Sequence, residues 1–253
     1  MMNFNEFARF YDLFYGSKDY RFEFKNLINR LPSIELKNVL ELGCGTGSYS
    51  IIAAESFENI TAIDLSEDMI KLAKTRNHRE NISYSVGDIR NFKISNKFEF
   101  VFSLFHVFSY LSSTNELESA FKGVSEHLNS GGLFAFDVWS SAGLVNNSLE
   151  IRRKEVQDKE GLKIIRYSYS SHNPHNETVM VNFDIIVLKE SESPRFYQEH
   201  HLMKYWSLDL IRNIAAKYNL ELLETFDLHS GDGINKSTFG ATYIFQKNYA
   251  STR

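Results

Sequence analysis

The sequence predicts an α/β fold in which a mainly parallel sheet, covered by helices, is interrupted by an inserted antiparallel sheet. Short apolar runs alternate with helix-like segments over residues 1–140, as they do in βαβ units. The stretch from Val39 to Ser50, VLELGCGTGSYS, joins a buried strand to a glycine-rich turn and a helix start. Residues 141–206 show strand-like alternation with a period of two, and the core pattern returns over 207–249. The expected organisation is therefore one core domain made of two segments, with a β insertion between them.

Composition and charge favour a protein that acts on a small molecule. The 253 residues carry a net charge of −4 and show no basic stripe, which argues against a nucleic-acid partner. No apolar run is long enough to cross a bilayer, and the first residues show no secretion signal. Cys44 is the single cysteine, so no disulfide can form within the chain, which suits a reducing compartment. We expect a cytoplasmic protein without a nucleic-acid or membrane partner.

The glycine-rich turn is the strongest local indication of a bound ligand. Gly43, Gly45 and Gly47 allow positive φ and lack the Cβ atoms that would keep a ligand away from the main chain. The dinucleotide fingerprint has the spacing G-x-G-x-x-G. This turn instead reads E-x-G-x-G-x-G from Glu41, which disfavours a nicotinamide-dependent oxidoreductase. Cys44, inside the turn, is expected to be a small packing residue.

Two further predicted strands end close to acidic residues. The run NITAID ends in Asp64, and an acid after the second strand of such a sheet can accept hydrogen bonds from ribose hydroxyls. The run ISYSVGDI ends in Gly87, Asp88 and Ile89. Together with the acid-led glycine turn, these features resemble the class I, Rossmann-like methyltransferases that use S-adenosylmethionine.

This resemblance implies a Rossmann-like seven-stranded sheet, with S-adenosylmethionine as cofactor and S-adenosylhomocysteine as its product. It assigns Asp88 and a neighbouring backbone amide to the adenine. Leu65 and Met69, just after the ribose acid, either flank the adenine or belong to the core. The fourth strand, Phe98–Leu104, is almost entirely apolar and ends at the carboxyl edge, where open parallel sheets bind ligands. The expected cofactor-binding residues are Tyr11, Tyr20, Glu41, Gly43, Cys44, Gly45, Gly47, Asp64, Leu65, Met69, Asp88, Ile89, Leu104 and Phe105.

The first thirty residues are rich in aromatic side chains at helical spacing, which predicts a leading helix packed over the core. A break at Gly16 to Lys18 would separate two short helices. The segment YDLFYGSKDY resembles the opening of small-molecule methyltransferases related to those acting on amino sugars and glycine. In those enzymes this segment caps the cofactor, and tyrosines approach its methyl group. The resemblance implies that Tyr11, Tyr15 or Tyr20 lines the active site, the alternative being that all three only pack.

The segment after the fourth strand is expected to meet both cofactor and substrate. His106 lies there and could accept a proton from an amine or hydroxyl, since an imidazole titrates near neutral pH; alternatively it only shapes the pocket. Strand Leu133 to Val138 delivers Asp137 and Trp139 to the same rim. We therefore predict His106, Tyr15 and Asp137 as catalytic residues.

The strand-like region after Trp139 resembles the β-sheet insertion of glycine and amino-sugar N-methyltransferases. The resemblance implies a substrate lid or a dimer surface over the carboxyl edge. In the strand around EHHLMKYW, His201 and Tyr205 share one side, and with Tyr15, His106 and Trp139 they are the expected substrate-binding residues. His200 and His201 are adjacent and point to opposite faces, so we expect no metal site there. Lys204 stands where a similar bacterial group tends to have arginine, which weakens a phosphate-binding interpretation.

The function that the sequence favours is methyl transfer from S-adenosylmethionine to a small molecule, most plausibly the amino group of a nucleotide-linked amino sugar. The lid resembles that of N-methyltransferases, which favours nitrogen. O-methylation of a sugar or another small metabolite is the alternative within the same class. A cofactor-binding protein without turnover is the alternative from a different class. A homodimer formed through the insertion is a further possibility, because the insertion offers sheet edges.

Overall fold

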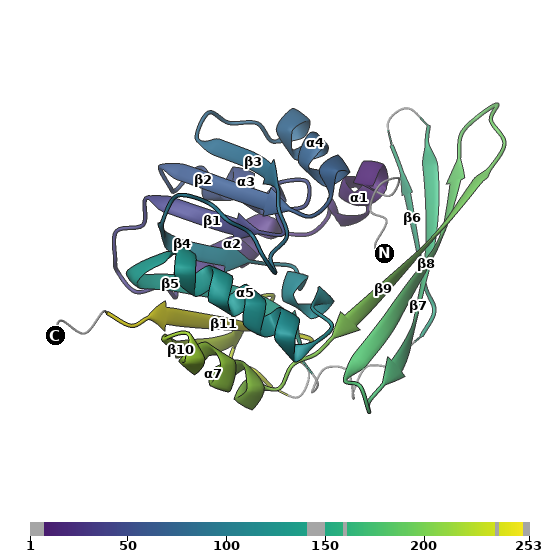
Figure 1. The fold of residues 1–253 in the computed structure, drawn as a ribbon. Helices are drawn as coiled ribbons and strands as arrows, with labels where there is room; N and C mark the ends of the chain where they lie inside the picture. The colour runs from purple at the N-terminus through teal and green to yellow at the C-terminus, as the bar shows by residue number, and fades with distance from the viewer. Residues whose placement is uncertain (1–7, 141–149, 159–160, 236–237, 250–253) are drawn as a thin grey trace.

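The computed structural model describes residues 8–140, 150–158, 161–235 and 238–249. Its larger sheet is built from β1 (Asn38–Leu42), β2 (Asn59–Asp64), β3 (Ile82–Val86), β4 (Phe98–Ser103), β5 (Leu128–Trp139), β10 (Leu220–Asp227) and β11 (Gly240–Lys247). The strand order is β10-β11-β5-β4-β1-β2-β3. Strands β1 to β5 pair in parallel, whereas β11 is antiparallel to both of its neighbours. This confirms the predicted seven-stranded α/β fold, which ends in the antiparallel pair β10 and β11 (Figure 1).

The helices are α1 (Ala8–Tyr15), α2 (Tyr20–Ile28), α3 (Ser48–Ala53), α4 (Glu67–Arg76), α5 (Thr114–His127) and α7 (Leu208–Lys217), with a 3₁₀ helix, η1, at Val107–Tyr110. Side chains of α2, α3 and α4 pack on one face of the seven-stranded sheet, and those of α5 and α7 pack on the other. The hydroxyls of Ser66, Ser113 and Ser207 accept hydrogen bonds from the first turns of α4, α5 and α7. These caps fix where each helix begins.

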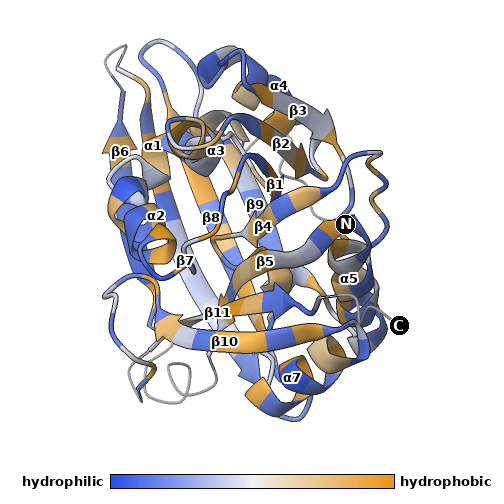
Figure 2. Ribbon diagram, turned by 90° about the vertical axis from the view of Figure 1, so that its left-hand side faces the viewer, coloured by the Kyte–Doolittle hydropathy of each residue, from blue (hydrophilic) through white to orange (hydrophobic). Residues whose placement is uncertain are grey.

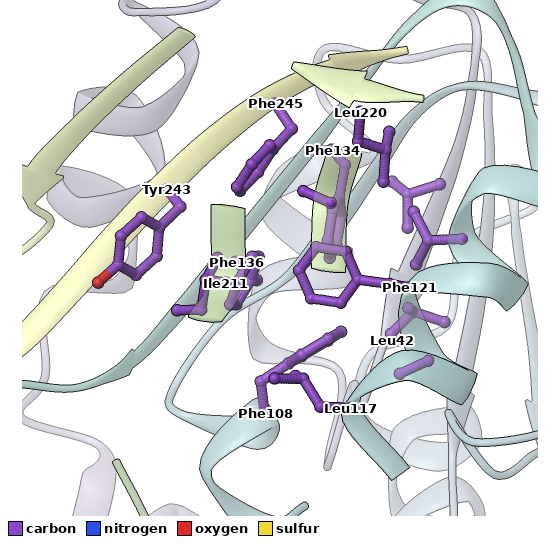
Figure 3. Packing of buried hydrophobic residues seen from close by; sticks show 14 of the residues in the cluster. Leu42, Phe108, Leu117, Phe121, Phe134, Phe136, Ile211, Leu220, Tyr243 and Phe245 are labelled. Atoms are coloured by element: carbon purple, nitrogen blue, oxygen red, sulfur yellow. The ribbon is translucent and has the colours of Figure 1, made fainter. Parts of the chain in front are cut away.

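An aromatic cluster forms the centre of the α5–α7 face. Phe108, Phe121, Phe134 and Phe136 are fully buried and pack together, and Phe245 of β11 packs against the last three of them (Figure 3). Alternate residues of β5 supply the two faces, because successive side chains of a strand point in opposite directions. Hydrophobic and hydrophilic residues alternate along the edge strand β10 and along α7 (Figure 2).

The inserted sheet is antiparallel and consists of β6 (Arg152–Gln157), β7 (Lys163–Asn173), β8 (Thr178–Leu188) and β9 (Arg195–Lys204), in that order. It stands beside the carboxyl ends of the parallel strands, with α1 packed between it and the core (Figure 1). Residues 141–149, at the predicted start of the insertion, lie outside the described residues. Strand β6, with the polar sequence RRKEVQ, lies within the region predicted to be strand-like but was not predicted as a separate strand.

The described helices include none with the length and apolar character needed to traverse a membrane. Within the same described ranges, no group of three or more His, Cys, Asp or Glu side chains is arranged to hold a metal ion. As predicted, the adjacent histidines of β9 point to opposite faces: His201 is buried, and His200 is exposed and contacts Asn182 2.7 Å away.

Candidate active site

A cavity of about 770 Å³ lies between the carboxyl edge of the seven-stranded sheet, α1 and the inner face of the inserted sheet. Most of the residues predicted for the site line this cavity. They are Tyr11, Tyr15, Tyr20, Gly43, Cys44, Gly45, Asp64, Leu65, Met69, Asp88, Ile89, Leu104, Phe105, His106, Trp139 and His201. Glu41, Gly47, Asp137 and Tyr205 do not line it.

The glycine-rich turn is held in a left-handed conformation by the strand next to it. Gly43, Gly45 and Gly47 have φ values of 74°, 55° and 85°. The amides of Gly43 and Cys44 both donate to the carbonyl of Ile63, at 2.8 and 3.0 Å. A Cβ on Gly43 would lie 2.5 Å from Val107, whereas a Cβ on Gly45 would meet nothing within 4 Å. The turn therefore needs glycine at position 43, and at position 45 it leaves main chain open to a ligand in the cavity.

Asp64 links the end of β2 to this turn. Its carboxylate accepts hydrogen bonds from the amides of Gly45, at 2.8 Å, and Ser66, at 2.9 Å. Burial raises the pKa of Asp64, while these backbone hydrogen bonds act in the opposite direction. Each carboxylate oxygen has two lone pairs, so further acceptor capacity remains on the cavity side. This arrangement suits a pair of sugar hydroxyls.

Asp88, at the end of β3, is ion-paired to Arg90, with 2.6 Å between Oδ2 and Nη2. Burial raises the pKa of the Asp88 carboxyl, but hydrogen bonds from Arg90 outweigh it and the net shift is downward. Arg90 also contacts Glu116 at 2.8 Å. Asp88 is therefore a fixed anion at the cavity wall, next to Ile89.

Glu41 has a different position from the one predicted. It is 2% exposed, lies behind the glycine-rich turn and accepts a hydrogen bond from the hydroxyl of Ser50 in α3. Burial raises its pKa to about 8. Gly47 likewise contributes to the turn from behind, because a Cβ there would lie 2.5 Å from the hydroxyl of Tyr84. Both residues support the turn, and neither reaches the cavity.

The raised pKa of Glu41 predicts a pH-dependent stability that glutamine would abolish. An unfolded glutamate loses its proton near pH 4.5, whereas the folded side chain keeps it until about pH 8. The folded state therefore binds more protons between these values, and the free energy of unfolding falls as pH rises through that window. As the pH rises from 5 to 8, we expect wild type to lose a few kcal/mol of stability that Glu41→Gln does not lose, since one pKa unit equals about 1.4 kcal/mol. Urea unfolding of both proteins at pH 5 and pH 8 measures this. A stability difference between variant and wild type that is the same at both pH values would contradict it.

The aromatic residues of α1 and α2 form one wall of the cavity. The rings of Tyr11 and Tyr15 lie 4.6 Å apart, and Tyr15 meets Phe105 edge-on at 5.1 Å. Asp12 secures α1 to the turn, because its carboxylate accepts a hydrogen bond from Thr46 at 2.6 Å and pairs with Arg76 at 2.5 Å. The predicted break between two short helices is confirmed at residues 16–19.

Arg166 of β7 joins α1 to the inserted sheet. Its guanidinium lies over the rings of Phe14 and Phe183 and is 3.1 Å from the hydroxyl of Tyr15. The side chain is buried, and its Nε has no hydrogen-bond partner among the described residues. The cation thus holds Tyr15 between helix and lid by cation–π contacts and one hydrogen bond. Period-two alternation places Arg166 on the inner face, but the contact with α1 is tertiary and was not predicted.

His106 is held at the end of β4 in a strained backbone conformation. Phe105 and His106 have φ values of 70° and 63°, which are unfavourable for residues with a Cβ. The amide of His106 donates to Asp137 at 2.8 Å, and its Nδ1 lies 3.0 Å from the other oxygen of that carboxylate. Asp137 therefore acts behind His106 and does not face the cavity, which corrects its predicted catalytic placement. Gly240 is required on the other side, since a Cβ there would lie 2.5 Å from Cε1 of His106.

The inner face of the inserted sheet supplies the wall opposite the glycine-rich turn. Register pairs Phe183 with Glu199 and Val181 with His201, and paired residues share a face. Tyr205 follows the last residue of β9, Lys204, and stays on the inner side, where it packs with Val179 and against the cavity-lining Trp139 and Val181. Its hydroxyl pairs with His172 at 3.0 Å, and the side chain does not itself line the cavity.

Tyr110 and Glu199 are among the residues at the site that the sequence did not single out. Tyr110 ends η1, lines the cavity and lies 3.2 Å from Nδ1 of His201. Glu199 lies 3.2 Å from Nε2 of the same imidazole. The alternation of β9 placed Glu199 beside His201, but the closeness of Tyr110 depends on how the inserted sheet packs on η1.

Residues 39–132 match the family model described as a methyltransferase domain. The chain is 29% identical over 205 residues to dTDP-3-amino-3,4,6-trideoxy-alpha-D-glucopyranose N,N-dimethyltransferase of Streptomyces venezuelae, covering 78% of this chain and 82% of that protein. It is 26% identical over 206 residues to malonyl-(acyl-carrier protein) O-methyltransferase 2 of Ilyobacter polytropus, covering 73% and 74%.

A solved S-adenosylmethionine-dependent methyltransferase of Clostridium acetobutylicum is similar over 97% of this chain and 99% of its own, with a TM-score of 0.81 and 24% identity. That likeness concerns the fold. It extends over the insertion as well as the seven-stranded sheet, because it covers nearly all of both chains.

Proposed function

We propose that this chain, which has the class I methyltransferase fold and carries a methyltransferase domain over residues 39–132, methylates the amino group of a nucleotide-linked amino sugar with S-adenosylmethionine. The proposal rests on one continuous cavity that extends from the glycine-rich turn to the inserted sheet. A cofactor at the turn and a substrate under the lid would share that space.

The described residues fit S-adenosylmethionine. Gly45 leaves open main chain at the cavity, Asp64 offers carboxylate oxygens for the ribose, and Asp88 lies beside Ile89 where the resemblance places the adenine. Leu65 is exposed and Met69 is buried, and both line the cavity, so each can contact the adenine face. When bound, the sulfonium supplies an electrophilic methyl group. Alignment of the acceptor and exclusion of water are then the main tasks of the protein.

The acceptor is assigned to the side of the cavity formed by His106, Tyr15 and the lid. His106 is fixed by Asp137 and Gly240 and presents a polar ring to the cavity, while Trp139 packs edge-on to it at 6.4 Å. Tyr15 is held by Arg166. These side chains can orient a sugar by hydrogen bonding and stacking. The related enzyme from Streptomyces venezuelae is named for an amino sugar linked to dTDP, which supports nitrogen as the acceptor.

The proposal is tested by incubating the protein with methyl-labelled S-adenosylmethionine and a dTDP-linked 3-amino sugar. The matched control is the same nucleotide sugar with a hydroxyl in place of the amine. We expect label in the amino sugar only, with NMR placing the methyl carbon on nitrogen. Label on oxygen would favour the O-methyltransferase alternative, and cofactor binding without label in any amine or sugar would favour a protein without turnover.

Two further parts of the proposal concern assembly and location. The outer face of the inserted sheet exposes Phe196 and Leu202, at 72% and 40%, and such apolar groups suit a second copy of the chain. We therefore propose a homodimer through the insertion, for which light scattering should give twice the mass of the chain. A cytoplasmic location is proposed from the single, unpaired cysteine.

A further inference from the structure

We propose that Tyr110, His201 and Glu199 form a proton-accepting chain for the substrate amine, joining the core to the lid. This inference rests on the proposed function, because it needs an amine in the cavity. It assigns the proton to a group other than His106, and it gives the lid a chemical role in addition to covering the site.

The three side chains are in series across the junction of η1 and β9. The hydroxyl of Tyr110 lies 3.2 Å from Nδ1 of His201, and Nε2 of His201 lies 3.2 Å from Oε2 of Glu199. His201 and Glu199 are 6% and 8% exposed. Tyr110 and His201 both line the cavity, whereas Glu199 stands behind them. The series thus begins at the cavity and ends at a buried carboxylate on the inner face of β9.

The order of donors and acceptors follows from Glu199. A carboxylate oxygen accepts hydrogen bonds, so Glu199 pairs with the tautomer of His201 that carries its proton on Nε2. The Nδ1 atom is then an acceptor, and the hydroxyl of Tyr110 donates to it. The phenolic oxygen of Tyr110 is also a hydrogen-bond acceptor, and in this proposal it accepts from an ammonium N–H of the substrate.

Primary amines have pKa values between about 8 and 10 and are mostly protonated at pH 7. A protonated amine has no lone pair and cannot attack a methyl group, so the site must remove a proton before transfer. The ammonium proton passes to the Tyr110 oxygen as the Tyr110 hydroxyl proton passes to Nδ1 of His201. The products are a neutral amine, a neutral tyrosine and an imidazolium facing Glu199. Charge is conserved, and Tyr110 never becomes an anion.

This shuttle agrees with the environment of Tyr110. Burial raises the pKa of Tyr110, and the charges of Glu199 and Asp64 and the neighbouring Tyr15 add to the effect. A free tyrosinate is thereby disfavoured, but relay through a neutral hydroxyl is not. Two further titratable side chains lie near these three residues. They are Tyr11, and Arg166, which contacts the hydroxyl of Tyr15. Phe183 packs on the imidazole, with ring centroids 5.1 Å apart.

The test compares Tyr110→Phe, His201→Asn and Glu199→Gln with wild type at pH 7 and about pH 9.5, using the dTDP-linked 3-amino sugar. The matched control is His200→Asn, which changes the neighbouring residue on the exposed face of β9. General acid–base groups contribute about 100-fold or more, so we expect Tyr110→Phe and His201→Asn to lower kcat/KM by about that factor at pH 7. The defect should shrink several-fold or more at the higher pH, where a much larger fraction of the amine is neutral in solution than at pH 7. Glu199→Gln should show a smaller defect with the same pH trend, and His200→Asn should behave as wild type.

Cofactor affinity is measured in parallel, and an unchanged Kd for S-adenosylmethionine shows that the variants are folded. A loss of kcat/KM that is equally large at both pH values would show that these three residues do not accept the amine proton. So would a pH-rescued defect in His106→Asn that is absent from His201→Asn. If wild type methylates no amine at either pH, the proposed function is wrong. The proposed role of Tyr110, His201 and Glu199, which depends on that function, is then wrong as well.

Discussion

Replacing Asp64 with alanine is expected to raise the Kd for S-adenosylmethionine by about 100-fold or more. In the proposed site the carboxylate accepts hydrogen bonds from two ribose hydroxyls, and each bond to a charged acceptor is worth about 1.5–3 kcal/mol. Two such bonds therefore correspond to about two powers of ten or more, since each tenfold change in affinity is 1.4 kcal/mol. The same carboxylate holds the amide of Gly45 at 2.8 Å. Its loss would also loosen the glycine-rich turn.

Calorimetric titration of the variant and of two comparison proteins separates these effects. Asp64→Asn keeps one acceptor for Gly45 and should lose less affinity than the alanine variant. Glu58→Ala removes an exposed acid at the opposite end of β2, where it only pairs with Lys37 at 3.4 Å, and should bind like wild type. An Asp64→Ala protein that binds the cofactor within threefold of wild type would show that this carboxylate does not hold the ribose.

Replacing Phe136 with alanine is expected to lower the free energy of unfolding by about 3–5 kcal/mol. Phe136 is fully buried, and its ring centroid lies 4.6 Å from Phe108, 5.0 Å from Phe134 and 5.5 Å from Phe121. Alanine would leave a cavity among rings that come from β5, η1 and α5, which cannot all move to fill it. The effect reaches the active site, because Asp137, which holds His106, is the next residue of β5.

Urea unfolding of Phe136→Ala and of Phe196→Ala provides the measurement and its control. Phe196 lies on the outer face of the insertion and is 72% exposed, so the monomer should lose about 0.5 kcal/mol or less. If the two variants lost the same free energy of unfolding, the assignment of the core to the aromatic cluster would be contradicted.

The fold was predictable because its signals are local. The glycine-rich turn lies between an apolar strand and a helix start, and each of Ser66, Ser113 and Ser207 precedes a helix that it caps. Strand ends of a parallel sheet meet at one edge, so Asp64 could be placed beside the turn from the order of the elements alone. The position of most cofactor residues in the cavity follows from the same rule.

The positions of the other site residues depend on contacts between segments that are distant in the sequence. Glu41 was assigned to the cofactor from its place in the motif, but the side chain on that face of β1 points to α3 and reaches Ser50. Tyr205 lies on the predicted side of β9, but it packs with Val179 and pairs with His172, so it stands beside the cavity lining and is not part of it. The contact of Tyr110 with His201 spans 91 positions in the chain. Only the packing of the lid on the core brings these two side chains together.

A structure of the protein with S-adenosylhomocysteine and the dTDP-linked amino sugar would test the proposed site most directly. We expect the ribose hydroxyls to lie on Asp64 and the sulfur to face the side of the cavity formed by Tyr15 and His106. We expect the sugar nitrogen to lie within hydrogen-bond distance of Tyr110. A cofactor product bound elsewhere, or an amine turned away from the sulfur with a hydroxyl in its place, would contradict it.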